Sequence, residues 1–239
     1  MKNKKYFAMV PARIGSTRLE KKNLALLNGK PLIAYAIEAA KSSGVFSRIV
    51  VNSDNEVFAK VAKRHDVEFY LRPAGLGSSK TKSDSVVYDF MSNYTSDIVA
   101  WVNPTSPLQT GDEIRNVVEF FIEQQLDSLI TVKREYVHCV KDNIPINFNI
   151  KEQFSQTQNL KPVDAFVYSV MMWRRETFMQ FYEKQGFAML CGRVGYYPVS
   201  KQTALIIKNI DDLMLADYAL RTKGSFRNYE IKYDNHDKK

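Results

Sequence analysis

Residues 11–23 read Pro11-Ala12-Arg13-Ile14-Gly15-Ser16-Thr17-Arg18-Leu19-Glu20-Lys21-Lys22-Asn23, directly after the apolar run Tyr6-Phe7-Ala8-Met9-Val10. The apolar run predicts a short strand, and the residues after it predict a loop with exposed backbone N–H groups and several cations. Gly15 would let the backbone approach an anion closely, and the hydroxyl groups of Ser16 and Thr17 are further donors. The guanidinium groups of Arg13 and Arg18 can each bind phosphate oxygens in bidentate fashion. The loop favours a polyphosphate ligand. The alternative is a basic surface turn, and the sequence pattern of a P-loop is absent.

The rest of the first half alternates between strand and helix patterns with short connections. One helical repeat of apolar residues ends at Gly44, and the capping patterns Ser53-x-x-Glu56 and Thr110-x-x-Glu113 each predict the start of a helix. The alternation predicts an α/β fold: a Rossmann-like, mostly parallel twisted sheet with helices on both faces, whose ligands bind at the carboxyl ends of the strands. The predicted strands are 6–10, 48–52, 67–71, 97–102, 127–134, 166–173, 192–199 and 203–207, and the predicted helices are 31–44, 53–65, 84–94, 110–125, 174–184 and 210–220.

The composition indicates a single globular domain over residues 1–239. The chain is 45% hydrophobic and 25% charged, with a formal net charge of +8. No basic-aromatic repeat or nucleic-acid module accompanies this charge, so a small polyanionic ligand is favoured over a nucleic acid. Cys139 and Cys191 form no metal-binding pattern. Neither the basic start Met1–Lys5 nor any apolar run predicts a signal peptide or a membrane span, and a cytoplasmic protein without a membrane partner is expected.

The pattern changes over residues 135–165, where Asn, Gln, Pro and Phe are mixed without a helical period. A loop of this length without structure is improbable inside a compact domain. We predict an extended arm or hairpin that packs on a partner subunit, and hence a homodimer.

The quoted loop resembles the signature of a known family. Pro-Ala-Arg-x-Gly-Ser-x-Arg-Leu followed by Lys-Lys-Asn is similar to the loop of the CMP-N-acetylneuraminate (acylneuraminate) cytidylyltransferases, which are related to the CMP-Kdo synthetases. The resemblance continues through residues 28–35, 50–54, 71–73 and 103–108, and the second half matches only in outline. It implies a fold of the nucleotide-diphospho-sugar transferase type and a dimer built through an inserted segment.

The resemblance also implies an activity, namely nucleotidyl transfer in which CMP passes from CTP to a sugar acid and pyrophosphate leaves. The acceptor would be a nonulosonate, similar to sialic acid, for surface glycan (polysaccharide) biosynthesis. Two alternatives stay open: CMP-Kdo synthesis or another acceptor, and a catalytically silent relative that only binds nucleotide. Positioning and charge neutralisation would supply most of the rate, with Mg²⁺ bridging the phosphates.

The expected site residues fall into four groups. The catalytic cations are Arg13, Arg18 and Lys22. The nucleotide would be bound by Ala12, Arg13, Gly15, Ser16, Asn23, Arg72, Thr81, Ser83 and Asn103. The acceptor would meet Asn103, Gln158 and Lys208, and Asp211 is the candidate metal ligand.

Some of these residues have simpler structural interpretations. Arg72 could be an exposed turn residue, Ser83 a helix N-cap, and Asn103 a cap at a strand end. Asp54, which follows the strand 48–52, is interpreted as a helix-start residue rather than as a metal ligand. Five aromatic residues are interpreted as core rather than as a sugar platform: Tyr168, Trp173, Phe178, Phe181 and Tyr182.

The sequence departs from the family pattern near the acceptor and the metal. Asn103 stands where glutamine is usual, Gln109 where arginine is common, and Glu20 where proline is usual. Ile206 and Lys208 replace the acidic pair that binds magnesium in relatives, so the metal carboxylates are missing unless Asp211 or Asp212 substitutes. We hypothesise that Lys208 replaces a metal electrostatically. Tyr168-Ser169-Val170 replaces the sugar-facing Asn-Gly-Ala turn, so the departures concern the acceptor more than the nucleotide.

Overall fold

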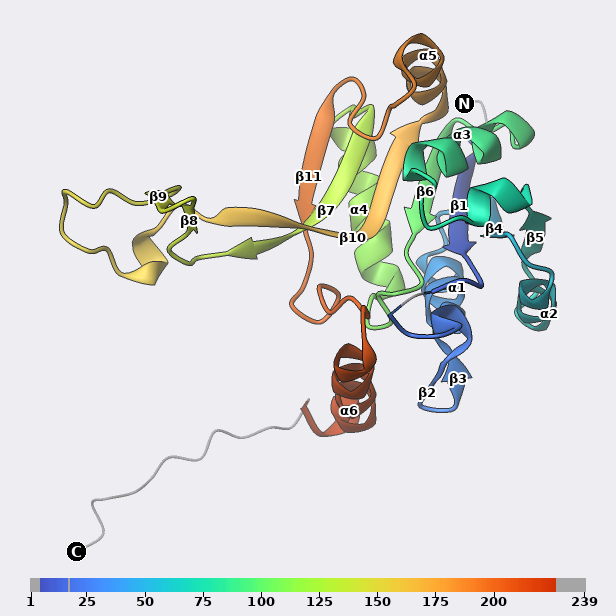
Figure 1. Cartoon of the computed structure of the whole chain (residues 1–239), viewed down its shortest axis with the longest axis horizontal. Helices are drawn as coiled ribbons and strands as arrows, with labels where there is room; N and C mark the ends of the chain where they lie inside the picture. The colour runs from blue at the N-terminus through green and yellow to red at the C-terminus, as the bar shows by residue number, and fades with distance from the viewer. Residues whose placement is uncertain (1–4, 17, 227–239) are drawn as a thin grey trace, which may run out of the picture.

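The computed structural model of the chain describes residues 5–16 and 18–226. Its central sheet has seven strands. Their spatial order is β11 (Val194–Pro198), β7 (Ser128–Glu135), β10 (Val163–Arg174), β6 (Ile98–Val102), β1 (Tyr6–Ala12), β4 (Arg48–Ser53) and β5 (Glu68–Leu71). β6, β1, β4 and β5 are parallel, β10 runs antiparallel between β6 and β7, and β11 is parallel to β7 (Figure 1).

Helices cover both faces of this sheet. Those of one face are α1 (Leu32–Ser43), α2 (Val57–Arg64) and α4 (Gly111–Glu123), and those of the other are α3 (Ser83–Asn93) and α5 (Arg175–Gln185). Successive side chains of β1 point to opposite faces of the sheet, so each face has its own buried cluster. Ala8 and Val10 belong to the first cluster and Met9 to the second. The predicted Rossmann-like fold, with a mostly parallel sheet and helices on both faces, is confirmed.

Local signals placed most helix ends correctly. Gly44 ends α1 in the left-handed conformation with φ 69°, and the Thr110 hydroxyl accepts from the Glu113 N–H at the start of α4. The capping box at Ser53 and Glu56 was wrong, because the chain makes an additional turn before α2. Asn55 Oδ1 accepts from the Val57 N–H there, and the Ser53 hydroxyl accepts from the Asn55 N–H.

The last predicted strand, 203–207, was also wrong. Those residues form a turn and an irregular segment, in which the Ile207 N–H donates to the Thr105 carbonyl. Thr203 and Ile207 are buried, so the apolar pattern of this segment reflects packing and not the hydrogen bonding of a β-strand. The chain then continues into α6 (Ile210–Phe226), which packs against the small hairpin of β2 (Leu26–Leu27) and β3 (Lys30–Pro31).

The predicted arm is an extended projection. β7 and β10 stay paired from Val163 with Glu135 to Phe166 with Val132, and together they carry the intervening residues away from the body (Figure 1). The tip of the arm contains the short pair β8 (Val140–Lys141) and β9 (Ile144–Pro145) and the 3-10 turn η3 (Thr157–Asn159).

No helix in the described part of the chain is long and apolar enough to cross a bilayer. Two features considered in the sequence lie outside the described residues: the hydroxyl of Thr17 and most of the basic start Met1–Lys5.

Candidate active site

A cavity of about 350 Å³ lies at the carboxyl ends of β1, β5 and β6. This is the edge at which open parallel sheets bind their ligands. Most of the predicted site residues line it, drawn from five separate segments of the chain. They are Ala12, Arg13, Ser16, Arg18, Lys22, Asn23, Arg72, Thr81, Ser83 and Asn103.

Four predicted residues do not line this cavity. Gly15 has open space where a Cβ would lie, so the described structure gives no steric reason for glycine there. Gln158 is an exposed residue of η3, in the arm. Lys208 and Asp211 are exposed residues just before and at the start of α6.

The lining of the cavity is strongly cationic. Arg13, Arg18, Lys22 and Arg72 contribute four positive charges, and no Asp or Glu belongs to the described lining. The Lys22 Nζ donates to the Ile207 carbonyl at 2.8 Å, which holds it at the cavity wall. Burial lowers the pKa of Lys22, the nearby charges of Arg18 and Arg13 lower it further, and Asp212 opposes them. Such a cluster of cations is stabilised by a polyanion.

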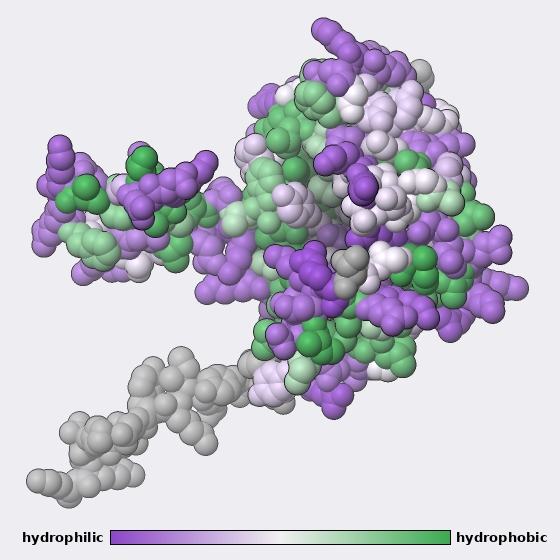
Figure 2. All heavy atoms as spheres, viewed as in Figure 1, coloured by the Kyte–Doolittle hydropathy of each residue, from purple (hydrophilic) through white to green (hydrophobic). Residues whose placement is uncertain are grey.

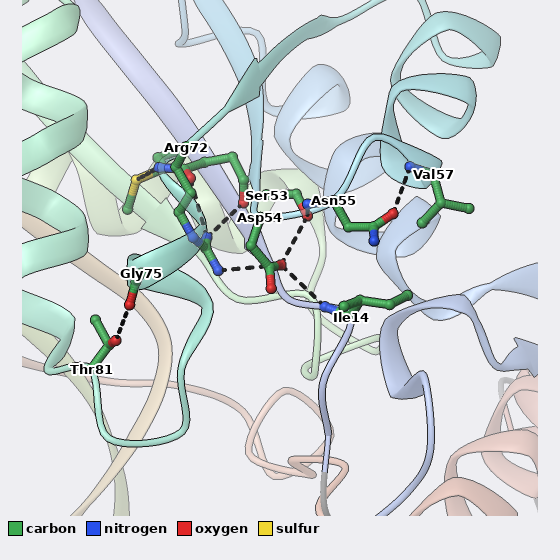
Figure 3. Close-up of polar contacts among 10 residues, drawn as sticks. Ile14, Ser53, Asp54, Asn55, Val57, Arg72, Gly75 and Thr81 are labelled. Atoms are coloured by element: carbon green, nitrogen blue, oxygen red, sulfur yellow. Dashed lines mark hydrogen bonds and ion pairs between the residues drawn. The ribbon is translucent and has the colours of Figure 1, made fainter.

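Arg72 is buried and held by two hydrogen bonds, and it is not an exposed turn residue. Its Nη1 donates to the Asn52 carbonyl at 2.9 Å and to Asn52 Oδ1 at 3.1 Å, both on β4 (Figure 3). Burial lowers the pKa of Arg72, whereas Asp54 and Asp89 raise it, and the guanidinium stays charged at neutral pH. The alternative interpretation of Arg72 is wrong because the side chain folds back over the neighbouring strand.

Asp54 is the residue whose role the sequence did not reveal. The helix α2 begins only at Val57, so Asp54 is not a helix-start residue. Its Oδ1 lies 3.8 Å from Arg72 Nη2 and accepts from the Ile14 N–H at 3.2 Å (Figure 3). One carboxylate therefore connects the arginine after β5 to the cationic loop after β1.

The segment after Arg72 forms a third wall. The Thr81 hydroxyl donates to the Gly75 carbonyl at 2.9 Å, which closes the loop over residues 75–81. The interpretation of Ser83 as an N-cap was wrong, since the N-cap of α3 is Lys82 and no side chain caps this helix. Ser83 is instead the first residue of α3 and lies at the cavity.

Asn103 caps the end of β6, as considered, and it also lines the cavity. Its Oδ1 accepts from the N–H and the hydroxyl of Thr105, and its Nδ2 donates to the Tyr168 carbonyl at 3.0 Å. These bonds stabilise the turn after β6, and the side chain also lines the cavity. Gln109, in the position where arginine is common, is buried, and its Nε2 donates to the Asn103 carbonyl.

Three residues of the lining have buried polar atoms without a partner among the described residues: Asn23 Oδ1, Arg72 Nε and Trp101 Nε1. A buried polar group without a hydrogen bond is costly, and a ligand can supply the missing partner. Trp101, on β6, was not predicted as a site residue, because its position in an apolar strand gives no signal of exposure to a cavity.

The residues present do not fit a metal held by protein carboxylates. Among the described residues, no three His, Cys, Asp or Glu side chains are grouped so that they could hold an ion. Asp211 is exposed, and Asp212 Oδ2 accepts from the N–H groups of Lys208 and Asn209. The Asp212 carboxylate therefore serves the start of α6.

The core interpretation of the five aromatic residues was only partly right. Trp173 and Phe178 are fully buried, and Tyr182 packs against the same cluster. Tyr168 and Phe181 are exposed, to 44% and 38%. Tyr168 has φ 60°, at a β-bulge where the pairing of β10 with β7 shifts between Phe166 and Met171.

Comparison with solved structures shows which known fold the chain has. The chain resembles CMP:2-keto-3-deoxy-manno-octonic acid synthetase complexed with CTP, with a TM-score of 0.70 and 12% identity over 92% of this chain and 99% of that one. It also resembles 4-diphosphocytidyl-2C-methyl-D-erythritol synthase from Anaerococcus prevotii, with a TM-score of 0.62 and 10% identity over 91% and 99% of the two chains. The chain has the fold of nucleotidyltransferases of the CMP-Kdo synthetase type.

The sequence specifies the family. The cytidylyltransferase family model matches residues 7–223, and the chain belongs to this family. It is 25% identical to an N-acylneuraminate cytidylyltransferase of Streptococcus agalactiae over 96% of its own length and 58% of the relative's. It is 34% identical to a pseudaminic acid cytidylyltransferase of Campylobacter jejuni over 65% of its length and 72% of the relative's. A CMP-N,N'-diacetyllegionaminic acid synthase of Legionella pneumophila is 37% identical over 47% and 51% of the two chains.

Proposed function

We propose that the chain transfers CMP from CTP to a sugar acid of the nonulosonate type and releases pyrophosphate. The observation that carries this proposal is the cavity at the carboxyl ends of β1, β5 and β6, with four cations and no acidic residue in its described lining. Its charge complements a triphosphate. The names of the relatives from S. agalactiae, C. jejuni and L. pneumophila support the choice of a cytidylyl donor and a sugar-acid acceptor.

In this reaction, a hydroxyl group of the acceptor loses its proton to water and its oxygen bonds to the α-phosphorus of CTP, while the bond from that phosphorus to the bridging oxygen of pyrophosphate breaks. Negative charge grows on the leaving group. Arg13, Arg18 and Lys22 are the groups we assign to neutralise it, because all three line the cavity. Cations fixed in a partly buried site stabilise such charge more effectively than they would in water.

The unpartnered polar atoms provide a place for the nucleotide's base and ribose. Arg72 Nε is a donor, suited to the O2 or N3 of cytosine, and Asn23 Oδ1 is an acceptor, suited to an amino group or a ribose hydroxyl. Ala12, Ser16, Thr81 and Ser83 supply smaller contacts along the same lining. Asn103, which lines the cavity just after β6, is assigned to bind the acceptor.

Magnesium enters the proposal only as a counter-ion that the triphosphate brings with it, and no step is derived through it. The four cations supply the charge neutralisation that this chain itself provides. A homodimer formed through the arm and a cytoplasmic location belong to the same proposal. Exposed apolar side chains on the arm support the first, and the two free thiols of Cys139 and Cys191 fit the second.

Two other functions remain as alternatives. Ile206 and Lys208, in place of an acidic pair, favour a silent relative that binds nucleotide without turnover. The fold is shared with CMP-Kdo synthetase, which favours Kdo as the acceptor.

One experiment separates these functions. The purified chain is incubated with CTP and each of a panel of sugar acids, with and without Mg²⁺, while pyrophosphate is measured. Release with a nonulosonate supports the proposal, and release with Kdo alone moves the assignment to Kdo. Binding of CTP without release for any acceptor would establish the silent relative.

A further inference from the structure

A second cavity adjoins the first at its Asn103 wall. Its volume is about 570 Å³, and Ser83, Trp101 and Asn103 line both cavities. The remaining lining residues are Lys82, Asp84, Ile130, Phe166, Tyr168, Met171, Met189 and Leu190. We call this second cavity the apolar cup. A molecule bound there would lie next to the nucleotide that we propose for the first cavity.

One wall of the cup is the β-bulge of β10. The Asn103 N–H donates to the Ser169 carbonyl at 2.9 Å, and Asn103 Nδ2 donates to the Tyr168 carbonyl. The Thr131 hydroxyl lies 2.9 Å from the Ser169 hydroxyl and accepts from the Val170 N–H, so side chains replace the ladder bonds that the bulge interrupts. The bulge holds Tyr168 in its left-handed conformation at the cup.

Aromatic contacts extend this wall. The Phe166 ring meets the Tyr168 ring edge-on, with centroids 5.7 Å apart, and stacks on Tyr196 at 5.6 Å. All three side chains are more than 40% exposed. Figure 2 shows apolar surface on the body beside the base of the arm.

The opposite wall is the segment after α5, which is also held firmly. Asp84 Oδ1 accepts from the N–H groups of Ala188 and Met189, and Trp173 Nε1 donates to the Met189 carbonyl. Met189 and Leu190 therefore present their side chains from a fixed backbone. Leu190 is half exposed at the cup.

The cup is mostly apolar, and its uncharged polar groups are the hydroxyl groups of Ser83 and Tyr168, the Asn103 amide and Trp101 Nε1, which has no partner among the described residues. Of the described residues that line it, Lys82 is the only cation and Asp84 the only acid, and the Asp84 carboxylate is already bonded to the segment after α5. Aromatic and thioether side chains make up most of the rest. A hydroxyl group that lies against the aromatic and thioether side chains loses hydrogen bonds to water without replacement, whereas a methyl group, including the methyl end of an N-acyl group, gains by burial.

We infer that the cup selects a sugar acid whose buried side carries methyl and N-acyl groups in place of hydroxyl groups. This inference rests on the proposed function, since it places the acceptor beside CTP, and it adds which acceptor the site prefers. Tyr168, Met189 and Leu190 would be the specificity-determining residues, with Lys82 at the rim as the partner of the acid's carboxylate.

Two acceptors of the same ring configuration test the inference. N,N'-diacetyllegionaminic acid carries an acetamido group and a terminal methyl where N-acetylneuraminic acid carries hydroxyl groups. We expect kcat/KM for the diacetylated acid to be larger by about tenfold or more, the range that apolar pockets achieve between substrates differing by small groups.

Variants of the residues that line the cup provide the second part of the test. Asn tolerates positive φ better than Tyr, so Tyr168→Asn removes the aromatic wall without added backbone strain. Tyr168→Asn and Met189→Gln should each reduce the preference by about threefold or more. Tyr218→Ser, at an exposed tyrosine of α6, is the matched control and should leave the ratio unchanged. Circular dichroism of each variant confirms that it is folded.

The outcomes separate the inference from the proposed function. Equal or better use of N-acetylneuraminic acid by the wild type would overturn the inference and leave the cytidylyltransferase assignment intact. An unchanged preference in folded Tyr168→Asn and Met189→Gln would overturn the assignment of the cup as the selecting site. CTP binding without pyrophosphate release for any sugar acid would remove the proposed function, and the inference with it.

Discussion

Arg72 Nη2 lies 3.8 Å from Asp54 Oδ1, and the two side chains are almost fully buried at the ends of neighbouring parallel strands. The same Asp54 oxygen accepts from the Ile14 N–H, two residues after β1 ends. The ion pair thus joins the end of β5 to the loop that carries Arg13. Removing the negative charge of Asp54 should therefore affect both the nucleotide cavity and the stability of the fold.

Asp54→Asn is the direct test of this connection. Asn can still accept from Ile14 but removes the carboxylate that forms an ion pair with the buried Arg72, so we expect a loss of about 2 kcal/mol in the free energy of unfolding. CTP affinity should fall by about tenfold because the arginine and the loop are no longer held together. Urea unfolding and calorimetry measure the two effects. The control is Asp112→Asn, whose ion pair with Arg115 is exposed and should contribute less than about 1 kcal/mol.

A pair of glycines in the 3-10 turn η2 (Ala74–Gly77) tests the packing around Asp54. A Cβ on Gly77 would clash with Asp54 Oδ2, whereas nothing lies within 4 Å of a Cβ on Gly75. Gly77→Ala must therefore displace either the turn or the carboxylate, and we expect CTP binding to weaken by about tenfold. Gly75→Ala should bind CTP as the wild type does. Equal binding by the two variants would show that Asp54 does not need its present position.

The alkaline limb of the pH profile should report Lys22. Its pKa is lowered from the ordinary value of 10.5, chiefly by burial. Below its lowered pKa, the Lys22 side chain is cationic and neutralises phosphate charge. As the pH rises through it, the charge is lost, so kcat/KM for CTP should fall at a pH below 10.5.

Lys22→Arg should remove this limb or move it upward, because a guanidinium stays protonated throughout the accessible range. Lys21→Arg, at an exposed lysine, is the control. A limb that is unchanged in Lys22→Arg would assign the titration to another group.

The proposed dimer should dissociate when acidic residues replace exposed apolar residues of the arm. Ile144 and Ile150 are 68% and 74% exposed, which is unfavourable for an isolated subunit and typical of an interface. We expect the wild type to sediment as a dimer and the double variant Ile144→Asp, Ile150→Asp as a monomer at micromolar concentration. The matched control replaces the exposed lysines of the same segment, Lys141 and Lys151, by Asp and should remain dimeric. A monomeric wild type would contradict the proposed assembly.

The sheet and most helices could be predicted because their signals are local. β4 and β6 are buried β-branched runs, and Gly44 and Thr110 mark helix ends by their own conformation or hydrogen bond. The cationic loop was visible for the same reason, since its residues are adjacent in the sequence. Their arrangement around one cavity then follows from the parallel strand order.

What sequence reasoning missed depends on contacts between distant residues. Asp54 resembles a helix-start residue until Arg72 folds back onto β4. Tyr168 has the pattern of a core strand residue, but Asn103 and Thr131 hold the β-bulge that turns it toward the cup. The segment 203–207 has an apolar pattern because Thr203 and Ile207 are buried, and the Ile207 N–H donates to the Thr105 carbonyl in a turn and not to a strand.

Titration of the wild-type chain with CTP in a calorimeter tests most directly whether the cationic cavity holds a cytidine triphosphate. We predict saturable heat with one CTP per chain, and its loss in a folded Arg13→Ala variant that also fails to release pyrophosphate. The absence of heat with CTP, both with and without Mg²⁺, would contradict the account, as would full binding and turnover by Arg13→Ala.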